Sequence, residues 1–156
     1  MPNYRRAYIP GGTYFFTLTL ADRSSRILLD HIAALRLSWR EVRQVWPFAV
    51  HAVAILPDHM HLVMKLPDGE ADFSTRLRLF KAGFTRRLPE AQKLEGRKGE
   101  RRVWQARFWE HVVRDEDELA RCIDYVHHNP VKHGYVAHPG DWLYSSFGRR
   151  NLDWQT

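Results

Sequence analysis

The sequence is short of the features that mark exported and membrane proteins. It holds one cysteine, Cys122, which excludes an internal disulfide and is typical of core packing in a reducing compartment. No apolar run approaches the roughly 18 residues that a membrane-spanning helix needs. The first residues are not followed by an unbroken hydrophobic stretch either. We therefore expect a soluble protein of the cytoplasm, associated with the nucleoid and without a membrane partner.

Acidic residues are also in the minority. The chain has 18 Asp and Glu against 24 Lys and Arg, which leaves a formal net charge of +6 and favours a polyanionic partner. At 156 residues, 44% of them hydrophobic, the chain is long enough to bury one substantial core. We expect a single domain over residues 1–156, with a C-terminal tail from about 137 to 156.

The hydrophobic pattern switches between strand and helix periods along the chain. Period-two alternation predicts the first strand, and the other elements follow from the same reasoning: strands at 14–20, 48–56, 59–66 and 103–114, helices at 30–46, 73–88 and within 115–130. This order predicts an α+β fold of the ferredoxin-like or RRM-like kind, an antiparallel sheet with helices packed on one face and the other face free for a ligand. The second helix is expected to display its basic side chains: Arg76, Arg78, Lys81, Arg86 and Arg87.

Two histidines, His59 and His61, stand two residues apart in a run of β-forming residues. On a strand, side chains at i and i+2 leave the same face about 7 Å apart, so two imidazoles can converge on one cation. A His-x-His pair alone is weak evidence, because hydrogen-bonded histidines on a sheet are common. A second segment gives the pair its weight.

That segment is the helix that begins after Asp115, a candidate N-cap with Glu118 three residues on. Tyr125 and Asn129 lie four residues apart, on one side of this helix and at the border of its apolar stripe. Because Pro130 disfavours the α conformation in the residue before it, we expect the helix to end close to Asn129. Taken singly, Tyr125 is a half-buried anchor and Asn129 a helix stop. Together with the histidine strand they suggest a nucleophile beside a metal.

With both segments in view, the chain resembles the REP-associated tyrosine transposases, a branch of the single-tyrosine HUH transposases of bacterial insertion sequences. The resemblance runs nearly end to end. The residues that carry it are Pro-Gly-Gly-Thr-Tyr-Phe-Phe-Thr-Leu at 10–18, Leu-Pro-Asp-His-Met-His-Leu-Val at 56–63, Trp-Gln-Ala-Arg-Phe-Trp-Glu-His at 104–111, Tyr-Val-His-His-Asn-Pro-Val-Lys-His-Gly-Tyr-Val at 125–136 and Trp-Leu-Tyr-Ser-Ser-Phe at 142–147.

The resemblance implies a role for each residue of the two segments. His59 and His61 would be paired metal ligands, Asn129 the third ligand and Tyr125 the nucleophile that forms a 5′-phosphotyrosine. Insertion-sequence relatives commonly carry glutamine where this chain has Asn129. The implied substrate is single-stranded DNA that folds into a hairpin beside a conserved tetranucleotide. A homodimer and a monomer both stay open.

Physical chemistry supports a metal in such a site. A phenol with an ordinary pKa near 10 is a poor nucleophile at neutral pH, and a divalent cation that polarises the scissile phosphate would lower the barrier. Mixed imidazole and amide ligation indicates Mn²⁺ or Mg²⁺, with Mg²⁺ the weaker binder. The candidate phosphate contacts are basic residues: Arg5, Arg6, Lys81, Arg86, Arg97, Lys98, Arg101, Arg102 and Lys132. The basic segment at 89–102 is expected to be a mobile loop.

Aromatic side chains offer a second kind of DNA contact. Tyr4 and Trp104 are candidates for stacking on unpaired bases, although core packing is the favoured reading of Trp104. The histidines at 111, 127, 128 and 133 are taken as structural or surface residues.

Two other functions stay open at this point. A nucleic-acid-binding module of RRM-like fold would stack bases on the free sheet face and cut no bond. A histidine-triad phosphate hydrolase would need a third histidine two residues after His61, where the chain has Val63.

Overall fold

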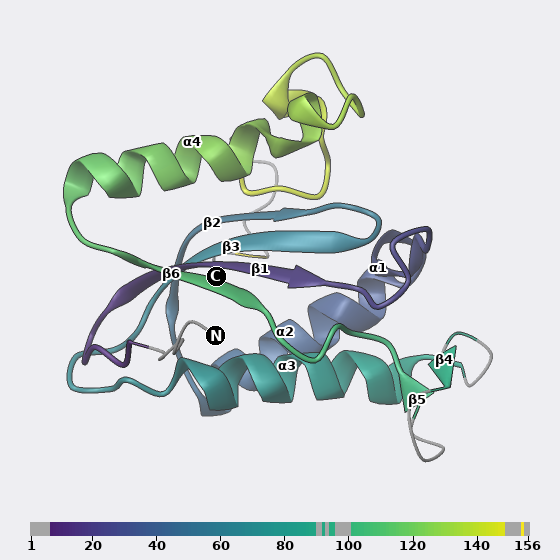
Figure 1. Ribbon diagram of the computed structural model, residues 1–156, viewed down its shortest axis with the longest axis horizontal. Coiled ribbons are helices and arrows are strands. Elements are labelled where there is room, and N and C mark those ends of the chain that lie inside the picture. The colour runs from purple at the N-terminus through teal and green to yellow at the C-terminus, as the bar shows by residue number, and fades with distance from the viewer. Residues whose placement is uncertain (1–6, 90–91, 93, 96–100, 149–153, 155–156) are drawn as a thin grey trace, which may run out of the picture.

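The fold is described from a computed structural model, in which residues 7–89, 92, 94–95, 101–148 and 154 are described (Figure 1). Its centre is a four-stranded antiparallel sheet with the order β2-β3-β1-β6. The strands are β1 (Thr13–Thr19), β2 (Ala49–Ile55), β3 (His59–Lys65) and β6 (Trp109–Val113). This arrangement confirms the α+β fold class and the ferredoxin-like strand order. The single-domain organisation over the whole chain stays a prediction.

One face of the sheet carries the main core, against α1 (Ile27–Asp30), α2 (Ile32–Val45) and α3 (Phe73–Arg87). The alternation in the first strand sends Tyr14, Phe16 and Leu18 to this face, where each is buried beside helix residues such as Trp39 and Phe80. This large aromatic core makes the sheet a rigid platform. The other face is therefore available for a site held in fixed geometry.

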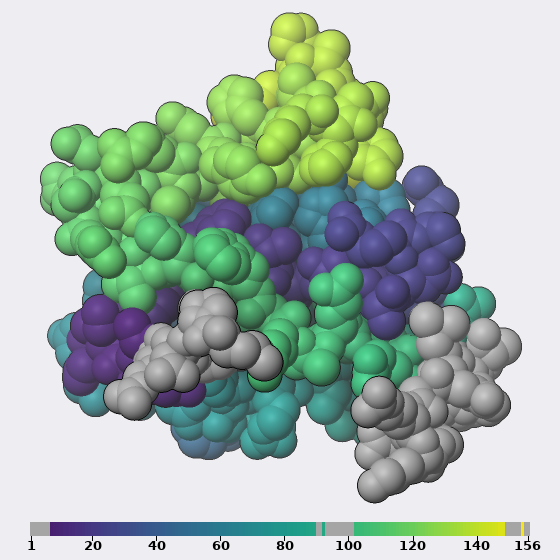
Figure 2. Space-filling model, viewed as in Figure 1, coloured from purple at the N-terminus to yellow at the C-terminus, as the bar shows by residue number. Residues whose placement is uncertain are grey.

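The other face is not entirely free, and here the structure differs from the sequence prediction of helices on one face only. The last long helix, α4 (Glu116–Lys132), crosses it above β2 and β3 (Figure 1). The reason is its apolar stripe, which includes Ile123 and Val126 and packs on small and apolar residues of the sheet such as Ala52 and Ala54. The part of this face over β1 and β6 stays open at the surface (Figure 2).

The predicted start of α4 is confirmed and its predicted end is wrong. Asp115 caps the helix, with its side chain accepting from the amide of Glu118 at 2.7 Å. The helix continues through Pro130 to Lys132. It then ends in a Schellman-type turn at Gly134, with φ +78°, in which the amide of Tyr135 donates to the carbonyl of Pro130. This turn supplies the stop that we had assigned to the proline.

Two further segments complete the described part. A short pair of strands, β4 (Leu94–Glu95) and β5 (Arg101–Arg102), lies within the segment expected to be a loop, and residues 96–100 between them lie outside the described residues. After a 3₁₀ turn at Pro139–Asp141, the C-terminal segment runs along the outer edge of β2. There the amides of Ile55 and Ser146 donate to the carbonyls of Tyr144 and Val53, both at 2.8 Å. No helix in the described residues is both long and apolar enough to cross a membrane.

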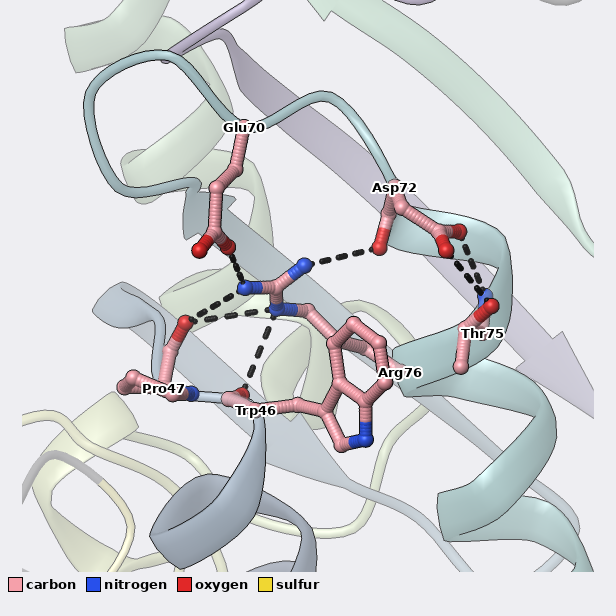
Figure 3. A network of polar contacts seen from close by, with 6 residues as sticks. All are labelled: Trp46, Pro47, Glu70, Asp72, Thr75 and Arg76. Atoms are coloured by element: carbon pink, nitrogen blue, oxygen red, sulfur yellow. Dashed lines mark hydrogen bonds and ion pairs between the residues drawn. The ribbon is translucent and has the colours of Figure 1, made fainter.

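Arg76 does not lie on the displayed face of α3, as the sequence pattern suggested, but is 1% exposed. Its guanidinium donates to the backbone carbonyls of Trp46, Pro47 and Asp72 and pairs with Glu70 (Figure 3). In this buried position Arg76 joins the turn after α2, through the carbonyls of Trp46 and Pro47, to the start of α3, through the carbonyl of Asp72. Its role is structural.

Candidate active site

The two histidines lie side by side on the face of the sheet that α4 partly covers. His59 and His61 are 6% and 5% exposed, and their ring centroids are 5.0 Å apart. The spacing on β3 and the face they share are therefore as the sequence predicts. Both rings are buried, and each makes a polar contact with a neighbouring side chain.

Those polar contacts use the same atom of each ring. Asp58 Oδ1 accepts from Nδ1 of His59 at 2.9 Å, while Arg23 holds Oδ2 of the same carboxylate. The Nδ1 atom of His61 lies 2.9 Å from Oγ1 of Thr17. With the proton on Nδ1 in both rings, the two Nε2 atoms keep free lone pairs. Such outer hydrogen bonds fix the tautomer and orientation of histidines that bind metals.

Electrostatics keep His61 neutral. Burial, reinforced by the nearby His59, lowers the pKa of His61 to about 3, and a polar contact with Asn129 only partly opposes the shift. The Asp58 carboxylate is also held in its ordinary ionic form, because hydrogen bonds from Arg23 and His59 outweigh the effect of burial and lower its pKa. At neutral pH His61 is therefore uncharged, and the neighbouring His59 is hydrogen-bonded to the Asp58 carboxylate.

Tyr125 stands at the edge of this pair. Its ring centroid is 5.5 Å from that of His61 and 5.6 Å from that of Phe15, both in edge-on geometry. The residue is 44% exposed, so its phenol is open to solvent. The ammonium of Lys132 lies 5.2 Å from the centre of the same ring. The helix α4 therefore delivers a phenol and a positive charge to the rim of the histidine pair.

Asn129, one turn after Tyr125, points into the interior and is 1% exposed. Neither its Oδ1 nor its Nδ2 makes a hydrogen bond of ordinary geometry with a described residue, although the amide lies close enough to His61 to oppose the lowering of its pKa. Most buried polar groups are paired, so an amide without such a bond beside His61 is an unusual and costly arrangement. The described residues hold no group of three His, Cys, Asp or Glu that could bind a metal, and the Asn129 amide places a further oxygen donor beside the imidazole of His61.

The residues expected to contact DNA fall into different places. Lys132 belongs to the site, whereas Lys81 and Arg86 lie on α3, on the other side of the sheet. Lys81 donates to the carbonyl of Gln105, and Arg86 lies 4.0 Å from Glu41. Arg101 and Arg102 form β5. Four more lie outside the described residues: Arg5, Arg6, Arg97 and Lys98. Contact of these side chains with DNA stays a prediction.

The two stacking candidates have different outcomes. Trp104 is 5% exposed and donates its indole N–H to the carbonyl of Lys81, so its core role is confirmed and its stacking role is wrong. Tyr4 lies outside the described residues.

Several residues of the site were missed by sequence reasoning. Thr17 contacts His61 and Arg23 contacts Asp58 from other segments of the chain, so only the fold reveals them. Asp58 precedes His59 directly and had been interpreted only as part of a turn. His133, expected to be a structural or surface residue, is exposed and has its ring centroid 5.2 Å from that of His59. Partial burial, together with the nearby His59 and the positive charge of Lys132, lowers the pKa of His133.

Known proteins are similar to this chain in sequence and in fold. No family model matches the chain. A Haemophilus influenzae protein described as a REP-associated tyrosine transposase is 44% identical over 153 residues, covering 96% of this chain and 87% of that protein. The REP-associated tyrosine transposase of Escherichia coli is 41% identical over 149 residues, covering 96% and 84%.

Solved structures of transposases are also similar to this chain. The structure of a REP-associated tyrosine transposase bound to a REP hairpin superimposes with a TM-score of 0.83 at 41% identity, over 94% of this chain and 83% of that chain. A structure described as that of a transposase from Deinococcus radiodurans, with a TM-score of 0.52 and 16% identity over 80% of this chain and 95% of that one, shares the fold alone.

Proposed function

Because this chain belongs to the REP-associated tyrosine transposases, we propose that it nicks and rejoins single-stranded DNA at hairpins through a covalent bond to Tyr125. The observation that carries the proposal is the position of the Tyr125 ring, 5.5 Å from that of His61 and open to solvent. One phosphate lying over this rim would touch both the phenol and whatever the histidines hold. No movement of α4 is needed to bring the two groups together.

We assign a divalent cation, Mn²⁺ or Mg²⁺, to His59, His61 and Asn129. Two features support the fit: the Nδ1 atoms of both rings are engaged elsewhere, and the buried Asn129 amide makes no hydrogen bond of ordinary geometry with a described residue. When bound, the cation would polarise the scissile phosphate and offset the charge that develops on it. The oxygen of Asn129 would then serve as a ligand instead of standing without an ordinary hydrogen bond among the described residues.

The chemistry of the chain itself is a transesterification at phosphorus. The Tyr125 oxygen forms a bond to the phosphorus, the bond to the 3′-oxygen breaks, the phenol proton passes to solvent and the 3′-oxygen takes one up. Lys132 beside the ring favours the approach of the anionic phosphate. Because the phosphotyrosine keeps the phosphodiester's energy, a 3′-hydroxyl can reverse the step and join a new strand.

The proposed substrate is hairpin DNA with an adjacent unpaired tetranucleotide. A solved relative is bound to a REP hairpin, and the net charge of +6 suits a polyanion. Location in the cytoplasm with the nucleoid is part of the same proposal. Sedimentation of the protein would distinguish a monomer from a homodimer.

The test is to mix the protein with Mn²⁺ and a labelled REP-type hairpin that carries unpaired flanks, and to look for a denaturant-resistant adduct. We expect the adduct from the wild type and none from Tyr125→Phe, because the phenylalanine keeps the ring contacts and lacks the oxygen. Tyr135→Phe is the matched control, since Tyr135 is also 44% exposed and does not contact His61 in the described structure. Adduct that persists in Tyr125→Phe would refute the assignment of the nucleophile.

A second arm of the experiment tests the metal site. His59→Ala should abolish the adduct and spare most DNA binding, because the metal acts on the transition state whereas affinity rests on many phosphates. Equal loss of cleavage and binding would count against this division of roles. DNA binding with no adduct from any variant, wild type included, would instead favour a non-catalytic module of RRM-like fold.

A further inference from the structure

Strand pairing places one tryptophan in line with the histidine site. In the register of the sheet, Thr17 of β1 is paired with His61 of β3 on one side and with Trp109 of β6 on the other. Residues paired directly across antiparallel strands point to the same face. Thr17 contacts the His61 ring, so all three side chains belong to the face that carries Tyr125. Trp109 lies two strand spacings, about 10 Å, from His61.

The ring of Trp109 is left open to solvent. The helix α4 packs over β2 and β3, and atoms of β1 are visible at the surface between the helix and the segment that leads into β6 (Figure 2). Trp109 is 59% exposed, and each of the other five tryptophans is buried or half-buried. Its ring makes no aromatic contact or hydrogen bond with another described residue. A large ring with one free face beside a catalytic site is typical of a binding surface.

The surroundings favour a nucleotide as the occupant. Arg107, two residues before Trp109, is exposed, and Lys132 lies beside the Tyr125 ring, so basic side chains are close to Trp109 in sequence and to Tyr125 in space. An aromatic face stacks on any base, and cations beside it attract the phosphates that link the bases. A protein partner with an apolar patch would gain less here, because the nearby charges would be buried with it.

We propose that Trp109 is a stacking platform for one unpaired base of the DNA strand, next to the phosphate that Tyr125 attacks. The inference rests on the proposed function and adds to it a residue that holds the cleaved strand in register. Stacking fixes the position of the base without reading its identity. The platform would thus set where the backbone lies over the histidine pair, while sequence recognition occurs elsewhere.

The experiment is a double-mutant cycle between the protein and the DNA, carried out in the Tyr125→Phe background so that no covalent bond forms. The probe is the REP-type hairpin with unpaired flanks, from which one base at a time is removed to leave an abasic site. We expect Trp109→Ala to weaken binding about tenfold, and one abasic position to weaken binding by the same factor. At that position the two changes together should cost no more than either alone.

Three comparisons keep the outcome clear. Trp109→Phe keeps an aromatic face and should retain most of the affinity, which also separates stacking from misfolding. Tyr8→Ala removes another exposed aromatic, 52% exposed against α3, and should bind like the wild type. Unchanged affinity in Trp109→Ala, or effects that add at every abasic position, would overturn the platform. So would a dimer that Trp109→Ala dissociates, since the ring would then belong to an interface between copies.

Failure of the platform and failure of the proposed function give different results. If the wild type forms the Mn²⁺-dependent adduct and Trp109→Ala binds normally, the platform alone is refuted. If the wild type forms no adduct, the transposase chemistry is refuted whatever the binding cycle shows.

Discussion

Two buried polar side chains on opposite faces of the sheet, Arg76 and Asn129, differ in how they are paired. Below the sheet, Arg76 is 1% exposed and each of its nitrogens has an acceptor (Figure 3). Above it, Asn129 is also 1% exposed, and neither amide atom makes a hydrogen bond of ordinary geometry with a described residue. A satisfied buried group joins segments together, while an unsatisfied one is a standing cost that a ligand can remove. Arg76 thus stabilises the fold, whereas Asn129 keeps an amide beside His61 that a ligand could bind.

The largest effect expected from this contrast is at Arg76. Arg76→Met should lower the free energy of unfolding by about 3 kcal/mol, because it leaves the carbonyls of Trp46, Pro47 and Asp72 buried without their donor. Urea denaturation would measure the change. Arg78→Met, an exposed position on the same helix, should stay within about 0.5 kcal/mol of the wild type. Similar changes in stability at the two positions would contradict the stabilising role of the buried Arg76.

A smaller change in stability is expected when the metal-free protein is acidified, and it comes from His61 on the upper face of the sheet. Burial lowers the pKa of His61 from 6.5 to about 3, so between these pH values the unfolded chain binds more protons than the folded one. The free energy of unfolding should therefore fall as the pH is lowered through this window, by up to about 1.4 kcal/mol per unit from His61. The measurement is urea denaturation at pH 6, 5 and 4 in the presence of a chelator.

The comparison that isolates this histidine is with His61→Gln, whose stability should depend less steeply on pH. His138→Gln, at an exposed position, should keep the slope of the wild type. If the slopes of wild type and His61→Gln coincide, the buried, neutral state of His61 is ruled out.

The smallest effect, and the one opposite in sign, is expected at Asn129. Asn129→Leu replaces an unpaired buried amide by an apolar group of similar size, so the metal-free protein should gain about 1 kcal/mol of stability. The same variant should lose the rise in melting temperature that Mn²⁺ gives the wild type. Asn129→Gln, which keeps the amide, should retain that rise. A loss of stability in Asn129→Leu, with the Mn²⁺ effect intact, would contradict the idea of a reserved donor.

Local patterns predicted the parts of the site that depend on neighbours in sequence. The two-residue spacing placed His59 and His61 on one face, and the hydrogen bond of Asp115 marked the start of α4. The apolar stripe identified which side of α4 is buried, which is why Tyr125 was expected at its border. Each of these features is determined within a few residues.

What could not be predicted depends on how distant segments meet. Arg76 has the polarity of a surface residue, and only the position of Pro47 above α3 makes it a buried one. The line from His61 through Thr17 to Trp109 requires β1 to lie between β3 and β6. The exposure of Trp109 likewise depends on where α4 stops covering the sheet. A periodic pattern gives the face of each residue but not its neighbours across the sheet.

The pairing of the C-terminal segment with β2 has a consequence for synthesis of the chain. The partners that complete the edge of β2 at Val53 and Ile55 come from Tyr144 and Ser146, about ninety positions later. During translation these edge groups face water until the ribosome has released residue 146. The same segment contacts α4, through His127 and Ser146, so the helix that carries Tyr125 receives its final support last. The helix that carries Tyr125 therefore lacks this contact until residue 146 has been synthesised.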